Sequence, residues 1–294
     1  MLVVAGPSSV TLAEKTAELL GCSLVKVDFK RFPDGESYVR LAREVKGEKV
    51  AIIQSTYPPQ DSHLLQLFLL VDASLRHGAS EVTAVVPYLA YARQDKVFLP
   101  YEPVSVEVVL KTLKCLGVKR LLTVNVHSPE ALKRVELECF DLSALSLLAE
   151  FFAGEGLKGA VAFAPDRKAA RLAEEASRIL GGGLGWFAKQ RDRVTGEVTS
   201  ELEQGEVEGR KVILFDDIIS SGGTMKLAAR KLLEAGASEV YAACVHSLMS
   251  EENYRRLLEA GIRRVVSTDT IPTFTSRVSV ASLLADGLRK FLEG

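Results

Sequence analysis

The chain has 294 residues, a formal net charge of −1 and a hydrophobic fraction of 47%. This length favours two domains, and the balanced charge argues against a nucleic-acid-binding surface. No apolar run approaches the length of a membrane span, and the first residues lack the basic segment of a signal peptide. Four scattered cysteines form no CxxC pair, which indicates reduced thiols. We therefore expect a soluble, cytoplasmic protein with neither a nucleic-acid nor a membrane partner.

Apolar runs alternate with helical patterns along the first half. The expected strands are 2–5, 50–54, 82–86 and 121–126, and the expected helices lie near 11–20, 63–77 and 104–116. Continuous Val, Ile and Leu runs are typical of buried parallel strands. The alternation predicts an α/β fold, a mainly parallel sheet flanked by helices. In such sheets ligands bind at the carboxyl ends of the strands.

Segments of the first half recur about 160 residues later in the chain. Residues 47–54 match residues 209–216, and residues 78–82 recur identically as residues 236–240. A period this long is not that of a solenoid, so each half is expected to be a domain. We place the domains at 1–145 and 146–294, and a final helix over 280–292 could pack on either half.

The most informative segment is an apolar strand that ends in Asp216 and Asp217 and leads through a turn into a helical pattern over 226–233. The turn consists of Ser220, Ser221, Gly222, Gly223 and Thr224. Backbone N–H groups and hydroxyls at a helix N-terminus favour a phosphate. Carboxylates suit sugar hydroxyls or a hydrated Mg²⁺. The segment thus predicts a site for a phosphorylated sugar, the alternative being an ordinary strand–turn–helix connection.

The matching loop of the first half has a different composition. Residues 55–60 include Pro58 and Pro59, which lack N–H donors. This loop cannot cradle a phosphate in the same way, so only one half is expected to have kept the sugar-phosphate site.

The segment 211–224 resembles the 5-phosphoribosyl 1-pyrophosphate (PRPP) motif of the type I phosphoribosyltransferase fold, whose members either consume or make PRPP. Five further motifs follow a family order, at residues 31–36, 87–96, 125–129, 163–166 and 188–192. With them, nearly the whole chain resembles the ribose-phosphate pyrophosphokinase family. The resemblance implies two tandem phosphoribosyltransferase-like domains related by internal duplication.

The resemblance also implies roles for residues of the first half. An adenine-binding loop would contain Phe32, Asp34 and Glu36, with the aromatic ring stacked on the base. Arg93 and Gln94 would contact ATP, and His127 would contact Mg²⁺–ATP. The family has an aspartate where this chain has Asn125, so this position carries no carboxylate here.

In the second half, the resemblance makes Asp166 a Mg²⁺ or ribose contact. Lys189 and Arg191 would be the catalytic cations at the start of a polar, mobile stretch over 192–208. The residues from Asp216 to Thr224 singled out above would bind ribose 5-phosphate. Lys168 stands where the family has a small residue, which puts the local geometry in question.

The implied reaction is transfer of the diphosphoryl group of ATP to ribose 5-phosphate, giving PRPP and AMP for nucleotide biosynthesis, with Mg²⁺ as cofactor. In the family the adenine loop often reaches ATP in a neighbouring subunit, which implies a homo-oligomer, at least a dimer. Two alternatives remain: a phosphoribosyltransferase that consumes PRPP, and a catalytically silent regulatory relative. A periplasmic-type sugar-binding protein would need a signal peptide.

Overall fold

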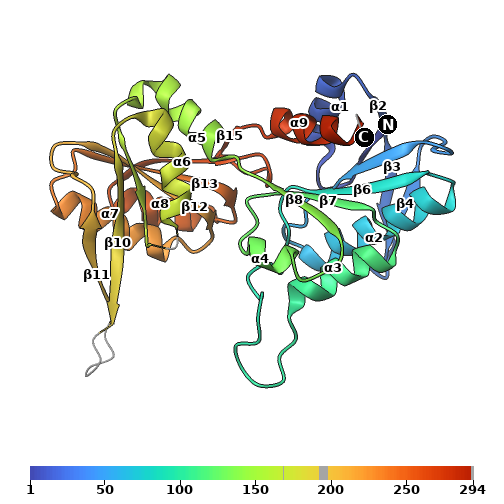
Figure 1. Ribbon diagram of the computed structural model, residues 1–294, viewed down its shortest axis with the longest axis horizontal. Helices are drawn as coiled ribbons and strands as arrows, with labels where there is room; N and C mark the ends of the chain where they lie inside the picture. Colours follow the sequence, from blue (N-terminus) through green and yellow to red (C-terminus); the bar gives the residue numbers. More distant parts are fainter. Residues whose placement is uncertain (168, 192–197, 293–294) are drawn as a thin grey trace. The chain divides into compact units, whose positions relative to one another are not determined.

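The computed structural model describes residues 1–167, 169–191 and 198–292. The chain divides into two units, Met1–Leu142 together with the segment that begins at Ser279, and Ser143–Val278. Each unit has a sheet with helices on both faces (Figure 1). The first unit thus takes in the C-terminal segment that the predicted ranges 1–145 and 146–294 give to the second domain. As functional domains, those two ranges stay a prediction.

The sheet of the first unit has six strands in the order β2-β1-β5-β6-β7-β8. All neighbours pair in parallel. The strands are β1 (Leu2–Ala5), β2 (Ser23–Val25), β5 (Lys49–Ile53), β6 (Glu81–Val86), β7 (Arg120–Val124) and β8 (Glu138–Leu142). The apolar side chains of the central strands are almost fully buried, as expected for a parallel sheet covered on both faces.

Five helices accompany this sheet. They are α1 (Val10–Leu20), α2 (Gln60–Arg76), α3 (Ser105–Cys115), α4 (Pro129–Leu132) and α9 (Ala281–Leu292). Helices α1 and α9 lie on one face, and α2 and α3 on the other (Figure 1). The final helix therefore packs on the first half of the chain.

Helix α9 is joined to the sheet by close packing and by one arginine. A Cβ at Gly287 would lie 3.0 Å from Leu142 Cδ1, so a larger residue there would crowd this leucine. The Arg120 guanidinium lies 5.1 Å from the centre of the Phe291 ring. Arg120 also forms ion pairs with Glu81 and, at 2.9 Å, with Glu138. The arginine thus links three strands to the last helix.

A separate antiparallel hairpin consists of β3 (Val27–Arg31) and β4 (Ser37–Leu41). Most of its side chains are exposed. The hairpin carries the first of the ATP motifs implied by the sequence.

The sheet of the second unit has seven strands in the order β11-β10-β9-β12-β13-β14-β15. All neighbours are parallel except β10 and β11. The strands are β9 (Val161–Ala164), β10 (Leu184–Arg191), β11 (Val198–Gln204), β12 (Lys211–Ile219), β13 (Glu239–Ser247), β14 (Ile262–Thr268) and β15 (Ser276–Val278). The helical elements are α5 (Leu145–Phe152), a π-helical turn η1 (Ala153–Leu157), α6 (Ala170–Leu180), α7 (Gly223–Glu234) and α8 (Glu251–Glu259).

The two sheets repeat one another. The order β1-β5-β6-β7 of the first unit is matched by β9-β12-β13-β14 in the second, and α1, α2 and α3 correspond to α6, α7 and α8. The predicted α/β architecture and the internal duplication are therefore confirmed. Among the described helices, none combines the length and the apolar character needed to cross a membrane.

Candidate active site

The turn that follows β12 leads into helix α7, as the sequence predicts. Gly222 adopts a left-handed conformation, with φ 76°, and α7 begins at Gly223. A Cβ at Gly222 would lie 3.0 Å from Leu257 Cδ2, so a larger residue meets both steric crowding and backbone strain. Ser221, Gly223 and Thr224 are exposed, and Ser220 is partly buried. The first N–H groups of α7 lie in this exposed turn, which suits an anionic ligand.

Asp216 and Asp217 lie within strand β12, and the prediction that the strand ends in these two acids is wrong by two residues. The strand runs on through Ile219, because Ile218 and Ile219 pair with His246 and Ser247 of β13. Each carboxylate accepts a hydrogen bond from the next backbone N–H, at 2.9 Å for Asp216 and 2.8 Å for Asp217. Both side chains therefore lie close to the backbone just before the turn.

The pKa of Asp216 is raised to about 8, chiefly by burial and then by repulsion from Asp217 and from Asp166. Negative charge is thus crowded at the carboxyl end of β12. A ligand that offers hydroxyl donors or positive charge would relieve this crowding.

Asp166 follows β9 and is partly buried. Its Oδ1 accepts from the N–H of Ala169 at 3.1 Å, just before α6, so it supports the start of that helix. Among the described residues, no group of three or more His, Cys, Asp or Glu side chains is placed to hold a metal ion. Metal binding by Asp166 and His127 stays a prediction, and Lys168 lies outside the described residues.

Lys189 and Arg191 lie on β10, where their backbones pair with Ser200 and Val198 of β11. Their side chains lie outside the described part of the structure. The sequence predicts a mobile polar stretch over 192–208, but β11 occupies part of it as a paired strand. Residues 192–197, between the two strands, also lie outside the described residues.

The predicted adenine loop is the tip of the β3–β4 hairpin. The N–H of Phe32 donates to the Glu36 carbonyl at 2.8 Å, and the N–H of Glu36 donates to Asp34 Oδ1 at 3.1 Å. Phe32 is 37% exposed, and the Lys30 ammonium lies 4.6 Å from its ring centre. The ring is therefore available at the surface and already has a cation on one face.

Arg93 and Gln94 lie in the loop after β6. Arg93 is exposed, while Gln94 Oε1 accepts a hydrogen bond from Ser105 at the start of α3. Gln94 is thus held by the fold, and its predicted contact with ATP stays a prediction.

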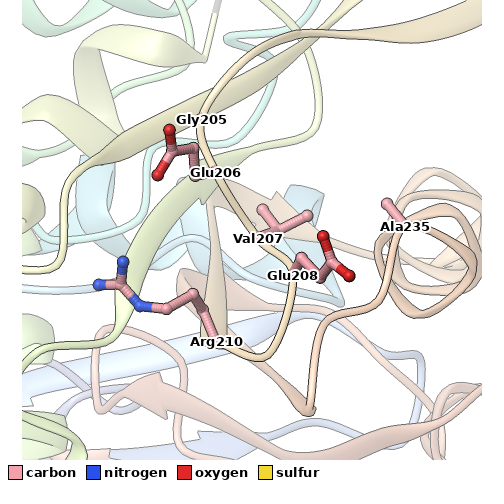
Figure 2. Close-up of a pocket in the computed structure, with 6 residues that line it drawn as sticks. All are labelled: Gly205, Glu206, Val207, Glu208, Arg210 and Ala235. Atoms are coloured by element: carbon pink, nitrogen blue, oxygen red, sulfur yellow. The ribbon is translucent and has the colours of Figure 1, made fainter.

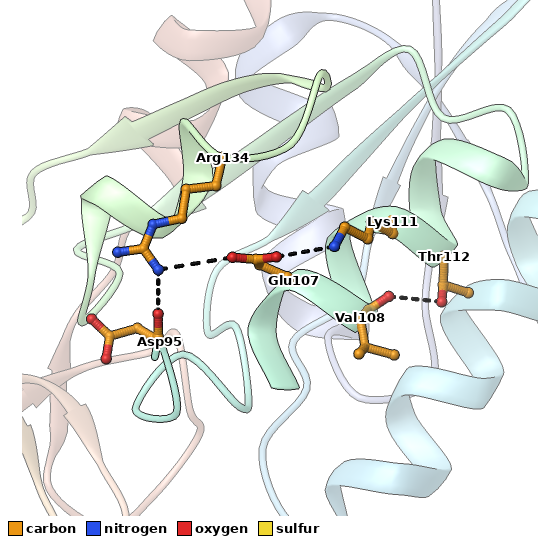
Figure 3. Close-up of polar contacts among 6 residues, drawn as sticks. All are labelled: Asp95, Glu107, Val108, Lys111, Thr112 and Arg134. Atoms are coloured by element: carbon orange, nitrogen blue, oxygen red, sulfur yellow. Dashed lines mark hydrogen bonds and ion pairs between the residues drawn. The ribbon is translucent and has the colours of Figure 1, made fainter. Parts of the chain in front are cut away.

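Asp95 connects this loop to the following motif. Its carboxylate accepts from Ser128 Oγ at 2.7 Å, and its carbonyl accepts from Arg134. Figure 3 shows Arg134 also facing Glu107, at 3.8 Å, and Glu107 paired with Lys111 at 3.0 Å. The sequence assigned no role to Asp95 or Ser128. The only signal for them was that each lies within one of the family motifs, 87–96 and 125–129.

His127 is exposed at the carboxyl end of β7. The preceding Asn125 is almost buried and adopts φ 40°. The N–H of Val126 donates to Asp141 Oδ1 at 2.9 Å. An amide side chain tolerates the left-handed conformation at Asn125, which gives that residue a backbone role.

A cavity of about 620 Å³ lies elsewhere in the second unit (Figure 2). Its lining consists of Gly205, Glu206, Val207, Glu208, Arg210 and Ala235. These residues precede β12 or follow α7, so the cavity lies at the amino end of β12. None of the predicted site residues lines it.

Comparison with known proteins covers both units. Residues 1–117 match the N-terminal domain of ribose phosphate pyrophosphokinase, and residues 146–282 match a phosphoribosyl transferase domain. Ribose-phosphate pyrophosphokinases from Methanosarcina acetivorans and Methanopyrus kandleri are 39% and 40% identical to the chain. The alignments cover 99% and 98% of this chain, and 100% and 98% of the relatives.

A solved structure agrees with these relatives. Phosphoribosylpyrophosphate synthetase from Mycobacterium smegmatis superimposes with a TM-score of 0.88 at 31% identity, covering 99% of this chain and 98% of that one. Because the likeness spans both units and nearly the full length of each relative, the chain belongs to the ribose-phosphate pyrophosphokinase family.

Proposed function

We propose that the protein transfers the diphosphoryl group of ATP to the anomeric hydroxyl of ribose 5-phosphate, giving PRPP and AMP for nucleotide biosynthesis. The observation that carries this proposal is the junction of β12 and α7. Here two carboxylates near the end of β12 precede an exposed turn at a helix N-terminus, in a chain that belongs to the ribose-phosphate pyrophosphokinase family.

The turn would bind the 5-phosphate. The first N–H groups of α7 have no partner within the helix and can donate to an anion in front of the helix N-terminus. The helix dipole would also stabilise a negative charge at that position. The hydroxyls of Ser220, Ser221 and Thr224 add donors beside them. Asp216 and Asp217 would accept from the 2- and 3-hydroxyls, since a carboxylate accepts hydrogen bonds strongly.

The same carboxylates suit Mg²⁺. The cation takes oxygen ligands, and one or two carboxylates are enough when substrate phosphates and water complete its shell. The raised pKa of Asp216 marks crowded negative charge that such a cation would relieve. Asp166 and His127 are the further residues that we propose for Mg²⁺. When bound, the cation would neutralise charge on the triphosphate.

In the chemical step, the anomeric oxygen attacks the β-phosphorus of ATP and a new P–O bond forms. The bond from the β-phosphorus to the bridging oxygen on the α-phosphate breaks, and AMP leaves with that electron pair. We assign no side chain as the general base, so the hydroxyl proton would pass to water. Lys189 and Arg191 would neutralise charge on the transferred group, which is the main need in phosphoryl transfer.

On the ATP side, Phe32 would stack on the base, and Asp34 and Glu36 would accept from its amino group. Arg93 would bind phosphate oxygens through its planar fork, and Gln94 would add a polar contact. We propose that the hairpin serves a neighbouring subunit, so that the active protein is at least a dimer. Location in the cytoplasm stays a prediction.

The test measures AMP release from ATP and Mg²⁺ with ribose 5-phosphate, with ribose, and with no sugar. We expect AMP and an equal amount of PRPP only with the sugar phosphate, because ribose lacks the anion that the turn binds. AMP without PRPP, or equal rates with ribose, contradicts the proposal. Nucleotide formation from PRPP and a free base, in place of AMP release, would instead identify a phosphoribosyltransferase.

A further inference from the structure

Two hydroxyl side chains are buried at the carboxyl end of β5. Ser55 and Thr56 each have 0% of their surface exposed. They begin the loop that corresponds to the phosphate-binding turn of the second unit. A buried hydroxyl is costly unless it is hydrogen-bonded, so the partners of these two show what the loop does.

The partners are backbone groups of residues 88–90. Thr56 Oγ1 donates to the Tyr88 carbonyl and accepts from the Ala90 N–H, both at 2.8 Å. The N–H of Thr56 donates to the same Tyr88 carbonyl at 2.9 Å. Ser55 Oγ accepts from the Tyr88 N–H at 3.1 Å. Strand β6 ends at Val86, so these bonds continue the support of the chain beyond the sheet.

The supported segment leads directly into the proposed ATP residues. Tyr91 follows Ala90 and adopts φ 66°, a left-handed conformation that is strained for a residue other than glycine. The N–H of Gln94 donates to the Tyr91 carbonyl at 3.1 Å, which closes the turn that carries Arg93. A strained turn keeps its shape only if the surrounding structure holds it in place. Thr56 holds Ala90, the residue directly before the strained Tyr91.

We propose that Thr56 is a positioning residue for the ATP side of the site, acting through the backbone of residues 88–90 on Arg93 and Gln94. The inference rests on the proposed ATP-binding role of those two residues. The loop that lost the phosphate-binding turn in the first unit thus keeps a function, because it sets the geometry of the neighbouring loop.

The test uses Thr56→Val, which keeps the side-chain shape and removes the hydroxyl. Thr56→Ser restores the hydroxyl. Ser74→Ala is the matched control, because Ser74 is equally buried and its hydroxyl donates to the Leu70 carbonyl within α2, at 2.8 Å. For each variant, AMP release is measured against ATP at saturating ribose 5-phosphate, and against ribose 5-phosphate at saturating ATP.

Thr56→Val leaves the buried Ala90 N–H without its acceptor, and the loss of this hydrogen bond should weaken ATP binding. We expect KM for ATP to rise about tenfold while KM for ribose 5-phosphate stays within about twofold. Thr56→Ser and Ser74→Ala should stay near the wild type for both substrates. A purely structural role would raise both KM values together or lower only the amount of folded enzyme.

The inference is overturned if folded Thr56→Val keeps the wild-type KM for ATP, if both KM values rise equally, or if Thr56→Ser is no better. If circular dichroism shows that Thr56→Val does not fold, Ser55→Ala replaces it, since it removes the neighbouring bond to the Tyr88 N–H. A wild-type protein that releases no AMP refutes the proposed function, and the inference with it. An active wild type with a normal Thr56→Val refutes the inference alone.

Discussion

The Asp216→Asn variant should be more stable than the wild type, and the difference should depend on pH. The pKa of Asp216 is raised from 3.8 to about 8 in the folded protein, chiefly by burial. Between these two values the folded chain holds a proton that the unfolded chain has released. The free energy of unfolding therefore falls as the pH rises through this range. Asparagine carries no charge and can still accept from the Asp217 N–H, so its stability has no such dependence.

The size of the effect follows from the shift. At pH 7 the pH is about 3 units above the pKa of Asp216 in the unfolded chain. The wild type therefore loses at most about 4 kcal/mol of its free energy of unfolding through this group. At pH 5, about one pK unit above the unfolded value, the same reasoning gives an upper limit of roughly 1–2 kcal/mol. We expect Asp216→Asn to gain about 2–4 kcal/mol at pH 7 and 1 kcal/mol or so at pH 5, while its turnover falls because a proposed ribose contact is lost.

The assay is urea unfolding at pH 5, 7 and 8, without divalent cations, for the wild type, Asp216→Asn and Glu234→Gln. Glu234 is an exposed carboxylate on α7, so its variant should follow the wild type at every pH. Adding Mg²⁺ should stabilise the wild type more than Asp216→Asn, if the cation replaces the proton. A stability difference that is the same at pH 5 and pH 8, or absent at both, would refute the argument.

Three further substitutions test other features. Gly222→Ala should lower the free energy of unfolding in urea by about 1–2 kcal/mol and weaken ribose 5-phosphate binding, because φ is 76° and the new Cβ meets Leu257. Gly223→Ala is the control, since its new Cβ would have no neighbouring atom nearer than 3.9 Å. Equal losses of stability in the two variants would contradict this explanation. Arg120→Met should cost about 1–3 kcal/mol in the same assay, since it leaves two glutamates and the last helix without their shared partner, and an unchanged midpoint would be the contrary result. Phe32→Ala should raise KM for ATP about tenfold or more without altering the unfolding midpoint, because the ring is exposed and a stacked base is worth about 1–3 kcal/mol; a normal KM would exclude stacking.

The central elements of both units could be predicted from the sequence to within a few residues. The expected strand 2–5 is β1, and the expected strand 82–86 lacks only the first residue of β6. These strands are buried on both faces, so they appear in the sequence as continuous apolar runs. Such runs can be recognised without knowing which strands pair with them. The left-handed turn at Gly222 was also readable, because few residues other than glycine adopt that conformation.

Features that depend on tertiary pairing could not be predicted. Asp216 and Asp217 look like the end of a strand, and only the pairing of Ile218 with His246 shows that β12 continues past them. Strand β11 has a polar sequence that is typical of a loop, and its pairing with β10 decides otherwise. The role of Thr56 depends on hydrogen bonds to residues more than thirty positions away, which no local pattern reveals.

The route of the chain has a consequence for synthesis on the ribosome. The first unit includes both the beginning of the chain and α9 at its end, while the second unit is encoded entirely between them. Every residue of the second unit has thus been translated before α9, whose Phe291 packs 4.8 Å from the Phe140 ring. The second unit therefore needs no residue beyond Val278, whereas the first unit cannot pack its last helix until α9 has been made. A chain that ended just before α9 would contain every residue of the second unit but an incomplete first unit.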